Sequence, residues 1–236
     1  MNNYNKNILK IIDNVKTDGN FTGSCATKIS KQNNRAFALP AGKKFSCPKA
    51  TIACKSCYAM KGRFVFANVQ SSHLRNWLLI KELLKANKIQ EASNKILTII
   101  PKTAKIFRIH TSGDFWSQKY IAVWDKIIKA RPNTKFWAYT RSFHLNFTLL
   151  TRHSNFVLWA STDKYNEKEA KKFVRRFKKS GTKHAYGPWG HNDKIPKNSF
   201  ICPVTSNKML IDGACEKCML CVVKKRVNKN VVFLEH

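Results

Sequence analysis

Acidic residues are scarce in this chain, whose 236 residues include 13 Asp and Glu against 44 Lys and Arg, a formal net charge of +31. Such an excess of one sign repels itself in the compact state and attracts polyanions. We expect nucleic acid as a partner, because neutralising its phosphates releases counterions. A generally basic proteome, rich in Lys and Asn, would produce the same excess without such a partner, and both interpretations stay open.

Long apolar runs are also missing. No segment approaches the roughly 18 uninterrupted apolar residues that a membrane span needs, and the most apolar region, 77–84, is broken by Lys81 and Glu82. Residues 1–7 are polar, unlike a secretory signal. The hydrophobic fraction of 43% is too high for a disordered chain. We therefore expect a soluble, cytoplasmic protein without membrane contact.

Familiar catalytic signatures are absent as well. The sequence contains no Walker phosphate loop, no Gly-x-Gly-x-x-Gly run and no Ser-His-Asp pattern, and its seven His show no HxxxH spacing. Residues 234–236 (Leu-Glu-His) resemble the start of an expression tag, so we assign them no function.

The distinctive residue type is cysteine. Eight cysteines are many for a reducing compartment, and seven of them form two tightly spaced groups, which favours metal ligation over a disulfide framework. The first group comprises Cys47, Cys54 and Cys57, and the second comprises Cys202, Cys215, Cys218 and Cys221. Cys25 stands apart and is expected to be a buried structural cysteine.

Each group suits one of two metals. Three thiolates on one loop can hold three irons of a 4Fe–4S cubane and leave the fourth iron open. The alternative for the first group is a zinc site that takes Cys25 as its fourth ligand. The CxxCxxC core of the second group resembles ferredoxin-type ligation, with zinc as the alternative. Four ligands would close that site and give it a structural or electron-relay role.

Apolar periodicity predicts an α/β fold. Helical spacing marks 4–16, 66–86, 88–100, about 120–128 and a segment that starts near Asn166. Strands are predicted at 105–111, 135–140, 156–161 and 183–186. Strands that are apolar on both faces and alternate with helices are typical of a parallel sheet. We expect an incomplete (β/α) barrel, or secondly a doubly wound open sheet.

The chain is expected to form one compact unit in three parts. An N-terminal helix and Cys-rich loop occupy 1–65, the α/β core occupies 66–195, and a Cys-rich extension occupies 196–233. Ligands of parallel α/β sheets bind at the carboxyl ends of the strands. These ends are predicted at 112–116, 141–143, 162–165 and 187–191.

Several runs resemble the phage- and plasmid-encoded gene product 88 family. They are 37–41 (Phe-Ala-Leu-Pro-Ala), 47–48 (Cys-Pro), 54–59 (Cys-Lys-Ser-Cys-Tyr-Ala), 108–110 (Arg-Ile-His), 112–115 (Ser-Gly-Asp-Phe) and 136–142 (Phe-Trp-Ala-Tyr-Thr-Arg-Ser). The resemblance runs from about Ala36 to Trp159. The cysteine spacing followed by Tyr-Ala also resembles a neighbouring phage family that is radical-SAM-like. Together these resemblances imply an iron–sulfur protein of a mobile element with a barrel of radical-SAM type.

The radical-SAM analogy also implies a cofactor site. In that superfamily the three-cysteine loop binds a 4Fe–4S cluster, and a Gly-containing acidic run receives the methionyl amine of S-adenosylmethionine (SAM). By position, Ser112, Gly113 and Asp114 fill that place, with Asp114 binding the amine through a charged hydrogen bond. Tyr58 and Arg141 are the remaining expected cofactor contacts.

The sequence departs from the usual radical-SAM pattern in three ways. The gap between Cys47 and Cys54 is six residues, where three is typical. Ser56 stands where an aromatic residue is usual, and the acidic run carries Asp where Glu is usual. These departures affect the expectation of SAM cleavage more than the expectation of cluster binding.

Other residues have a functional and a plain interpretation each. His110 is either a site residue or a partly buried histidine whose hydrogen bonds are satisfied within the fold. Arg141 and Ser142 either bind an anion, or Arg141 forms a surface salt bridge. The basic run of 171–179 is a phosphate-tracking surface or a solvated helix face. The aromatic segment 184–191 stacks bases or packs in the core.

Three functions therefore compete. The first is a radical-SAM-like enzyme that acts on nucleic acid or a nucleic-acid-bound partner. The second is a non-catalytic iron–sulfur protein that binds DNA or RNA, and the third is a zinc-stabilised nucleic-acid binder.

Overall fold

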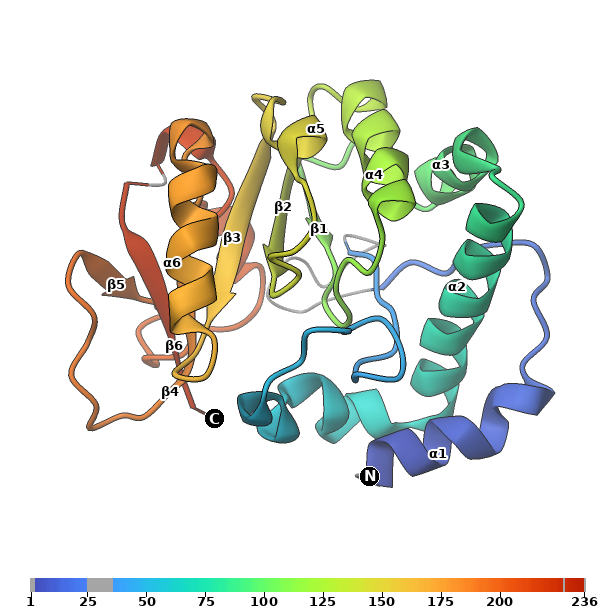
Figure 1. Ribbon diagram of the computed structural model, residues 1–236, viewed down its shortest axis with the longest axis horizontal. Helices are drawn as coiled ribbons and strands as arrows, with labels where there is room; N and C mark the ends of the chain where they lie inside the picture. Colours follow the sequence, from blue (N-terminus) through green and yellow to red (C-terminus); the bar gives the residue numbers. More distant parts are fainter. Residues whose placement is uncertain (1–2, 25–35, 227, 236) are drawn as a thin grey trace.

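The computed structural model describes residues 3–24, 36–226 and 228–235. Its centre is one parallel six-stranded sheet (Figure 1) with the order β1-β2-β3-β4-β6-β5. The strands are β1 (Ile106–Ile109), β2 (Lys135–Thr140), β3 (Phe156–Thr162), β4 (Lys183–Trp189), β5 (Ser199–Ile201) and β6 (Asn230–Leu234). The predicted mixed α/β fold with a parallel sheet is confirmed. From β1 to β4 neighbours in the sheet are neighbours in the sequence, without the reversal of order that defines a doubly wound sheet.

Helices connect the strands near the predicted positions. The α-helices are α1 (Asn3–Ile11), α2 (Ala67–Lys85), α3 (Ile89–Thr98), α4 (Gln118–Ala130), α5 (Thr148–Thr151), α6 (Glu167–Arg176) and α7 (Ala214–Cys218). The 3-10 helices are η1 (Ile12–Asn14), η2 (Ile52–Ser56), η3 (Tyr58–Met60), η4 (Gly62–Val65), η5 (Lys178–Ser180) and η6 (Lys224–Arg226). The start of α4 shows how sequence sets a boundary, because the Ser117 hydroxyl accepts a hydrogen bond from the Tyr120 N–H.

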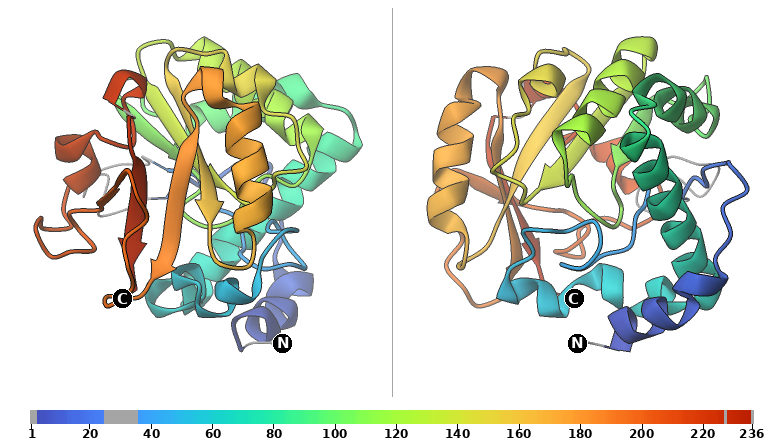
Figure 2. Two further views of the ribbon diagram at one scale, coloured as in Figure 1. Left: turned by 60° about the vertical axis from the view of Figure 1, so that its left-hand side comes forward. Right: turned by 45° about the vertical axis from the view of Figure 1, so that its right-hand side comes forward.

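The two faces of the sheet pack against different parts of the chain. Strand side chains alternate between faces, so Phe107, Phe136 and Phe156 join the core beneath the helices. Trp137 and Trp159 lie on the opposite face, where the C-terminal cysteine segment packs against them. Figure 2 shows α7 and α6 on opposite sides of the sheet. The C-terminal extension therefore builds part of the core.

The N-terminal part lines the free edge of β1. Ala36 forms a parallel bridge with Arg108, and the Phe37 N–H donates to the Arg108 carbonyl at 3.1 Å. The chain then passes beneath the carboxyl ends of the strands before entering α2 (Figure 1). The cysteine loop thus reaches the edge of the sheet at which ligands were predicted to bind.

The C-terminal extension contributes β5 and β6, which the sequence did not predict. Leu234 is buried as the last residue of β6, and the Glu235 N–H donates to the Trp189 carbonyl at 2.9 Å. These residues are integrated into the sheet, while their origin as a tag stays a prediction. Among the described residues, no helix combines the length and apolar character that crossing a bilayer requires.

Candidate functional site

The first cysteine group lies on the carboxyl edge of the sheet. Two hydrogen bonds fix its loop there, one from the Thr51 hydroxyl to Asp163 Oδ2 at 2.6 Å and one from the Tyr58 hydroxyl to the Thr111 carbonyl at 2.5 Å. Thr111 follows β1 and Asp163 follows β3, so the loop spans the strand ends. A tight turn joins Cys54 to Cys57, in which the Cys57 N–H donates to the Cys54 carbonyl at 3.2 Å.

The three thiols of this group influence one another. Burial raises the pKa of Cys47 to about 12, with further increases from Asp114, Cys57 and Cys54. Burial likewise raises the pKa of Cys57, and Cys54 adds to that increase. Deprotonating these thiols without a cation is therefore costly. A bound metal centre would reverse this preference, because coordination deprotonates a thiol.

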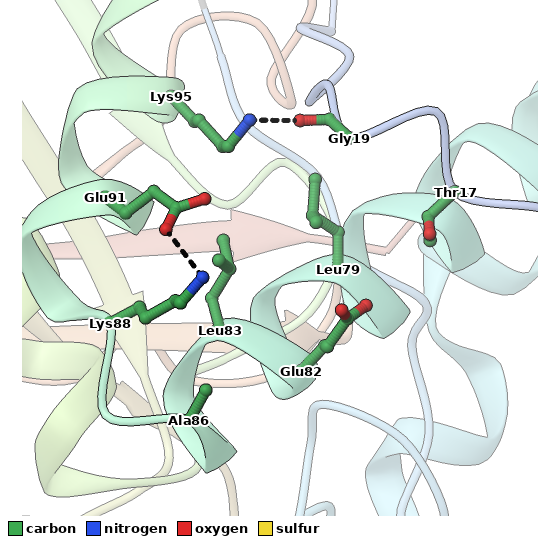
Figure 3. A pocket seen from close by; sticks show the side chains of 9 residues that line it. All are labelled: Thr17, Gly19, Leu79, Glu82, Leu83, Ala86, Lys88, Glu91 and Lys95. Atoms are coloured by element: carbon green, nitrogen blue, oxygen red, sulfur yellow. Dashed lines mark hydrogen bonds and ion pairs between the residues drawn. The ribbon is translucent and has the colours of Figure 1, made fainter.

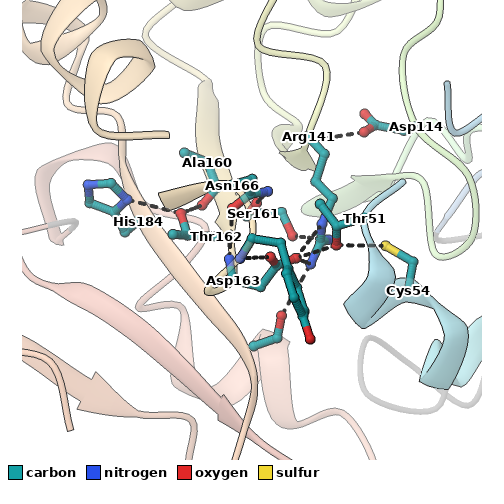
Figure 4. A network of polar contacts seen from close by, with 12 residues as sticks. Thr51, Cys54, Asp114, Arg141, Ala160, Ser161, Thr162, Asp163, Asn166 and His184 are labelled. Atoms are coloured by element: carbon teal, nitrogen blue, oxygen red, sulfur yellow. Dashed lines mark hydrogen bonds and ion pairs between the residues drawn. The ribbon is translucent and has the colours of Figure 1, made fainter. Parts of the chain in front are cut away.

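Arg141 is the hub of the polar network beside the loop (Figure 4). Its guanidinium donates to Asp163 Oδ2 at 3.0 Å, to Ser161 Oγ at 2.5 Å and to the Gly187 carbonyl at 3.2 Å. The ion pair is buried, with 17% of the Arg141 side chain and 3% of the Asp163 side chain exposed. The structure therefore uses Arg141 to join the ends of β2, β3 and β4.

Asp114 is similarly engaged. Its carboxylate accepts hydrogen bonds from the Phe115 N–H at 2.7 Å, the Thr140 hydroxyl at 2.6 Å and the Arg141 N–H at 2.8 Å. Burial raises its pKa to about 6, although these donors oppose the rise. Three of roughly four acceptor positions are thus occupied, and the carboxylate clamps the ends of β1 and β2 together.

Gly113 and Ser112 support the cysteine loop from below. Gly113 has φ +93°, and a Cβ added there would lie 2.8 Å from Leu39 Cβ. The Ser112 carbonyl accepts a hydrogen bond from the Leu39 N–H at 2.9 Å, and its side chain is buried beside Tyr4. Glycine at 113 lets the segment that leads to Cys47 lie close against β1.

The second cysteine group covers the other face of the sheet. The carbonyl of Cys221 accepts a hydrogen bond from Trp159 Nε1 at 3.0 Å. Burial raises the pKa of the Cys221 thiol, and Cys215, Cys202 and Cys218 raise it further. The four thiols of the group, separated by up to 19 positions in the sequence, therefore lie within electrostatic reach of one another.

Arg108 connects the two groups, a feature that the sequence reasoning missed. Its Nη2 donates to the Tyr58 hydroxyl at 3.0 Å, beside Cys57. Its guanidinium also lies over the Tyr139 ring, 5.1 Å from the centroid. Burial alone would lower the pKa of Arg108, but Tyr58, Tyr139 and Cys215 raise it above its usual value. The available signal was an arginine inside a short, otherwise apolar strand, a position that demands buried partners.

The cysteines are not drawn tightly around one point. All seven described cysteines are thiols, and within the described ranges no three His, Cys, Asp or Glu are arranged to hold a metal ion. A single zinc ion gathers its thiolates at about 2.3 Å, whereas a cubane distributes them over separate irons. Cys25 lies outside the described residues, so its predicted roles stay predictions.

Two hollows of the described surface lie away from the candidate site residues. One of about 250 Å³ opens between α2 and α3 (Figure 3), where Lys95 Nζ donates to the Gly19 carbonyl at 2.8 Å and Lys88 pairs with Glu91 at 3.2 Å. Another, of about 360 Å³, is lined by residues of the 204–211 loop. Neither contains a candidate site residue.

Comparison with known proteins places the chain in a family. A family model described as "Gene product 88" matches residues 3–224. The chain belongs to the Gene product 88 family. Two relatives called "Gene 88 protein", from Mycobacterium phages L5 and D29, are each 32% identical to it over 235 and 236 residues. The matches cover 93% of this chain and 91% of each relative, and no solved structure matches.

The expected Gene product 88 membership and phage association are confirmed, and these names state no activity. In this family member His110 is buried, with Nε2 2.8 Å from the Tyr120 hydroxyl. On α6, Lys171 pairs with Glu167 at 2.7 Å, and Arg176 donates to the Leu145 carbonyl at 2.7 Å. The plain interpretations of these residues thus fit the structure.

The aromatic segment of β4 packs on itself. His184 stacks on Tyr186 with ring centroids 5.2 Å apart, and Tyr186 meets Trp189 at 5.6 Å. His191 Nε2 lies 3.0 Å from the Glu235 carbonyl. Residues 184–186 are buried in the sheet, whereas Gly187 contacts Arg141 beside the cysteine loop.

Proposed function

We propose that the chain is an iron–sulfur protein of a mobile genetic element, radical-SAM-like, that acts on or is bound to nucleic acid. The main support is the position of Cys47, Cys54 and Cys57, which one loop carries to the carboxyl edge of a parallel sheet. The strand order β1 to β4 further supports a sheet of incomplete-barrel type. The net charge of +31 supports nucleic acid as the partner.

The donor set of the first group fits a cubane cluster. Three thiols come from one loop, and Cys54 and Cys57 lie close enough to Cys47 to add to the rise in its pKa that burial causes. A bound 4Fe–4S cluster would supply an electron and an open iron. The chain itself fixes the loop through Thr51 and Tyr58 and places Arg141 beside the thiols.

The second group fits a closed centre. Cys202, Cys215 and Cys221 pack against the cluster that contains Trp137 and Trp159, and Cys218 lies within electrostatic reach of Cys221. Such a centre would stabilise the fold or relay electrons. We propose a second iron–sulfur cluster here, with zinc as the alternative.

For SAM, we propose binding at the carboxyl edge near Tyr58, Ser112, Gly113, Asp114 and Arg141. Asp114 retains about one acceptor position after its three internal hydrogen bonds. We assign that position to the methionyl amine, with Arg141 holding the surrounding strand ends in place.

The first experiment is to measure iron, zinc and acid-labile sulfide, with an absorption spectrum, on protein purified without oxygen. We expect several irons with matching sulfide. Cys47→Ala and Cys215→Ala should each remove only the content of their own site, while Cys25→Ala serves as the matched control and leaves iron unchanged. Zinc without sulfide, lost in Cys25→Ala, would overturn the iron–sulfur proposal.

A non-catalytic iron–sulfur nucleic-acid binder is the second candidate. It is favoured by the internal hydrogen bonds that already occupy Asp114 and Arg141. The two functions separate when reduced protein is incubated with SAM and nucleic acid. Formation of 5′-deoxyadenosine supports the enzyme, and tight binding without it supports the binder.

A further inference from the structure

Exposed apolar side chains gather around the first cysteine group. Ile52 and Tyr58, which flank Cys54 and Cys57, are 58% and 50% exposed. Tyr165, in the loop after β3, is 47% exposed. Side chains of this size are normally buried, and a cluster of them at one edge marks an interaction surface.

Hydrogen bonds place Tyr165 beside the cysteine loop. The Tyr165 N–H donates to Asp163 Oδ1 at 2.8 Å, and the other oxygen of the same carboxylate accepts from Thr51, next to Ile52. The Tyr58 ring is fixed by its hydroxyl, which is held between Arg108 and the Thr111 carbonyl. The Tyr58 ring is thus held in place, whereas Tyr165 is held through its backbone and has Lys164 Nζ 5.2 Å from its ring centroid. Both side chains keep part of their surface exposed.

Basic residues are frequent in the segments that carry these rings, and Lys164 Nζ lies 5.2 Å from the Tyr165 ring centroid. The exposed members of this group are Lys43, Lys44, Lys49, Lys55, Lys61, Arg63 and Lys164. No Asp or Glu occurs between Asp18 and Glu82 in the sequence. At this edge Asp114 and Asp163 are buried and hydrogen-bonded. Glu167, two residues after Tyr165, pairs with Lys171 at 2.7 Å, so the loop itself keeps a positive charge.

We propose that this edge binds single-stranded nucleic acid, with bases stacked on Tyr58 and Tyr165 and phosphates contacting the surrounding lysines. The inference rests on the proposed function for the identity of the partner as nucleic acid, and it names the form and the surface. Exposed aromatic rings can stack on unpaired bases, whereas a duplex hides the faces of its bases. The positive loop tracks the backbone.

The placement also relates the strand to the thiols. Ile52 and Tyr58 lie on either side of Cys54 and Cys57 in the sequence, and Tyr165 follows β3 and is joined to the loop through Asp163, which accepts from both Tyr165 N–H and Thr51. A strand seated on these residues would cross the first cysteine group. Unpaired bases, which need no extrusion from a duplex, would then lie at the candidate site.

The test measures binding of the full chain to fluorescent oligo(dT) and oligo(U) of about 16 nucleotides, and to a duplex of equal length, by anisotropy. Tyr165→Leu should weaken single-strand binding about ten-fold, while Tyr165→Phe keeps the ring and the affinity. Lys55→Ala with Lys61→Ala should lower the slope of log affinity against log salt by about 0.7 for each charge removed.

Lys102→Ala with Lys105→Ala is the matched control, because these exposed lysines precede β1 at the opposite edge of the sheet. An unchanged affinity in this control supports the surface. Equal losses in both lysine pairs, no loss in Tyr165→Leu, equal affinity for the duplex, or a preference for vesicles of anionic lipid over the oligonucleotides would each overturn the inference.

Metal analysis of the same samples separates the two proposals. A ring-dependent preference for single strands in protein without iron and sulfide would keep the surface and remove the iron–sulfur proposal. A full content of iron and sulfide, together with single-strand binding that Tyr165→Leu leaves unchanged, would support the iron–sulfur proposal and remove the proposed binding surface.

Discussion

Single residues at the carboxyl edge contribute measurably to the free energy of unfolding, and Gly113 is the clearest case. An alanine there would need a positive φ and would bring its Cβ within 2.8 Å of Leu39. We expect Gly113→Ala to lower the free energy of unfolding by about 2–4 kcal/mol, as strain and overpacking add. Gly62→Ala is the control, since φ is +52° there with no atom within 4 Å. Similar losses in the two variants, measured by urea denaturation, would show that the contact with Leu39 is unimportant.

His110 makes stability depend on pH. Burial first, and then Arg108, lowers its pKa from 6.5 to about 3. As the pH falls below 6.5 the unfolded chain takes up a proton that native His110 refuses, so stability is lost by about 1.4 kcal/mol per pH unit from this group. His73, with a pKa of about 4, acts in the same direction. Asp114, with its raised pKa, acts in the opposite direction between about pH 6 and 3.8.

The measurement is urea denaturation from pH 7.5 to 5.0. We choose His110→Asn, because asparagine tolerates the φ of 70° at this position. The variant should be less stable at pH 7.5, having lost the contact with Tyr120, and should show a visibly smaller dependence on pH. An unchanged dependence would mean that His110 is not the group that titrates.

At the scale of elements, Arg108 on β1 joins the cysteine loop to the C-terminal segment. Arg108→Met removes the donor to Tyr58 and the cation beside Cys215. We expect a loss of about 2 kcal/mol in stability and reduced metal content at both cysteine groups. Arg75→Met, which removes a partly exposed contact of 3.9 Å with Asp18, should change neither. Loss of metal at one group alone would show that Arg108 serves only that group.

The elements differ in how far the sequence revealed them. Strands β1 to β4 were predicted because each is short, apolar on both faces and followed by a helix or turn. Strand β5 has three residues, too few for a periodic signal, and β6 follows a long segment rich in Cys and Lys. Both owe their conformation to pairing with distant residues, a tertiary effect that local patterns do not contain.

The candidate site divides in the same way. The two cysteine groups were visible because ligand spacing is local, and the strand ends at Asp114 and Arg141 followed from the α/β pattern. The partners of these residues were not visible. Asp163 and Thr51 are separated by 112 positions, yet they share a hydrogen bond that fixes the loop. Only the folded chain shows that Asp114 and Arg141 make internal hydrogen bonds that hold the strand ends together.

For the whole molecule, the charge of +31 sets a condition on stability. Like charges repel across the compact state, and salt screens them over a Debye length of about 10 Å at 0.1 M. We expect the melting temperature to rise by several degrees between about 20 and 200 mM NaCl. Lys102→Glu with Lys105→Glu, each lowering the net charge by two, should reduce that rise. A melting temperature that does not change with salt would show that local ion pairs already offset the repulsion among the positive charges.

The position of β6 has a consequence for how the chain is made. Strand β5 pairs with β6 alone, and β6 sits between β4 and β5 although it follows both in the sequence. During synthesis the cysteines at 202–221 therefore leave the ribosome before β6, the strand that joins this segment to the sheet. Under the proposed function, this order would give a metal or its carrier an interval in which to reach the thiols before β6 inserts between β4 and β5.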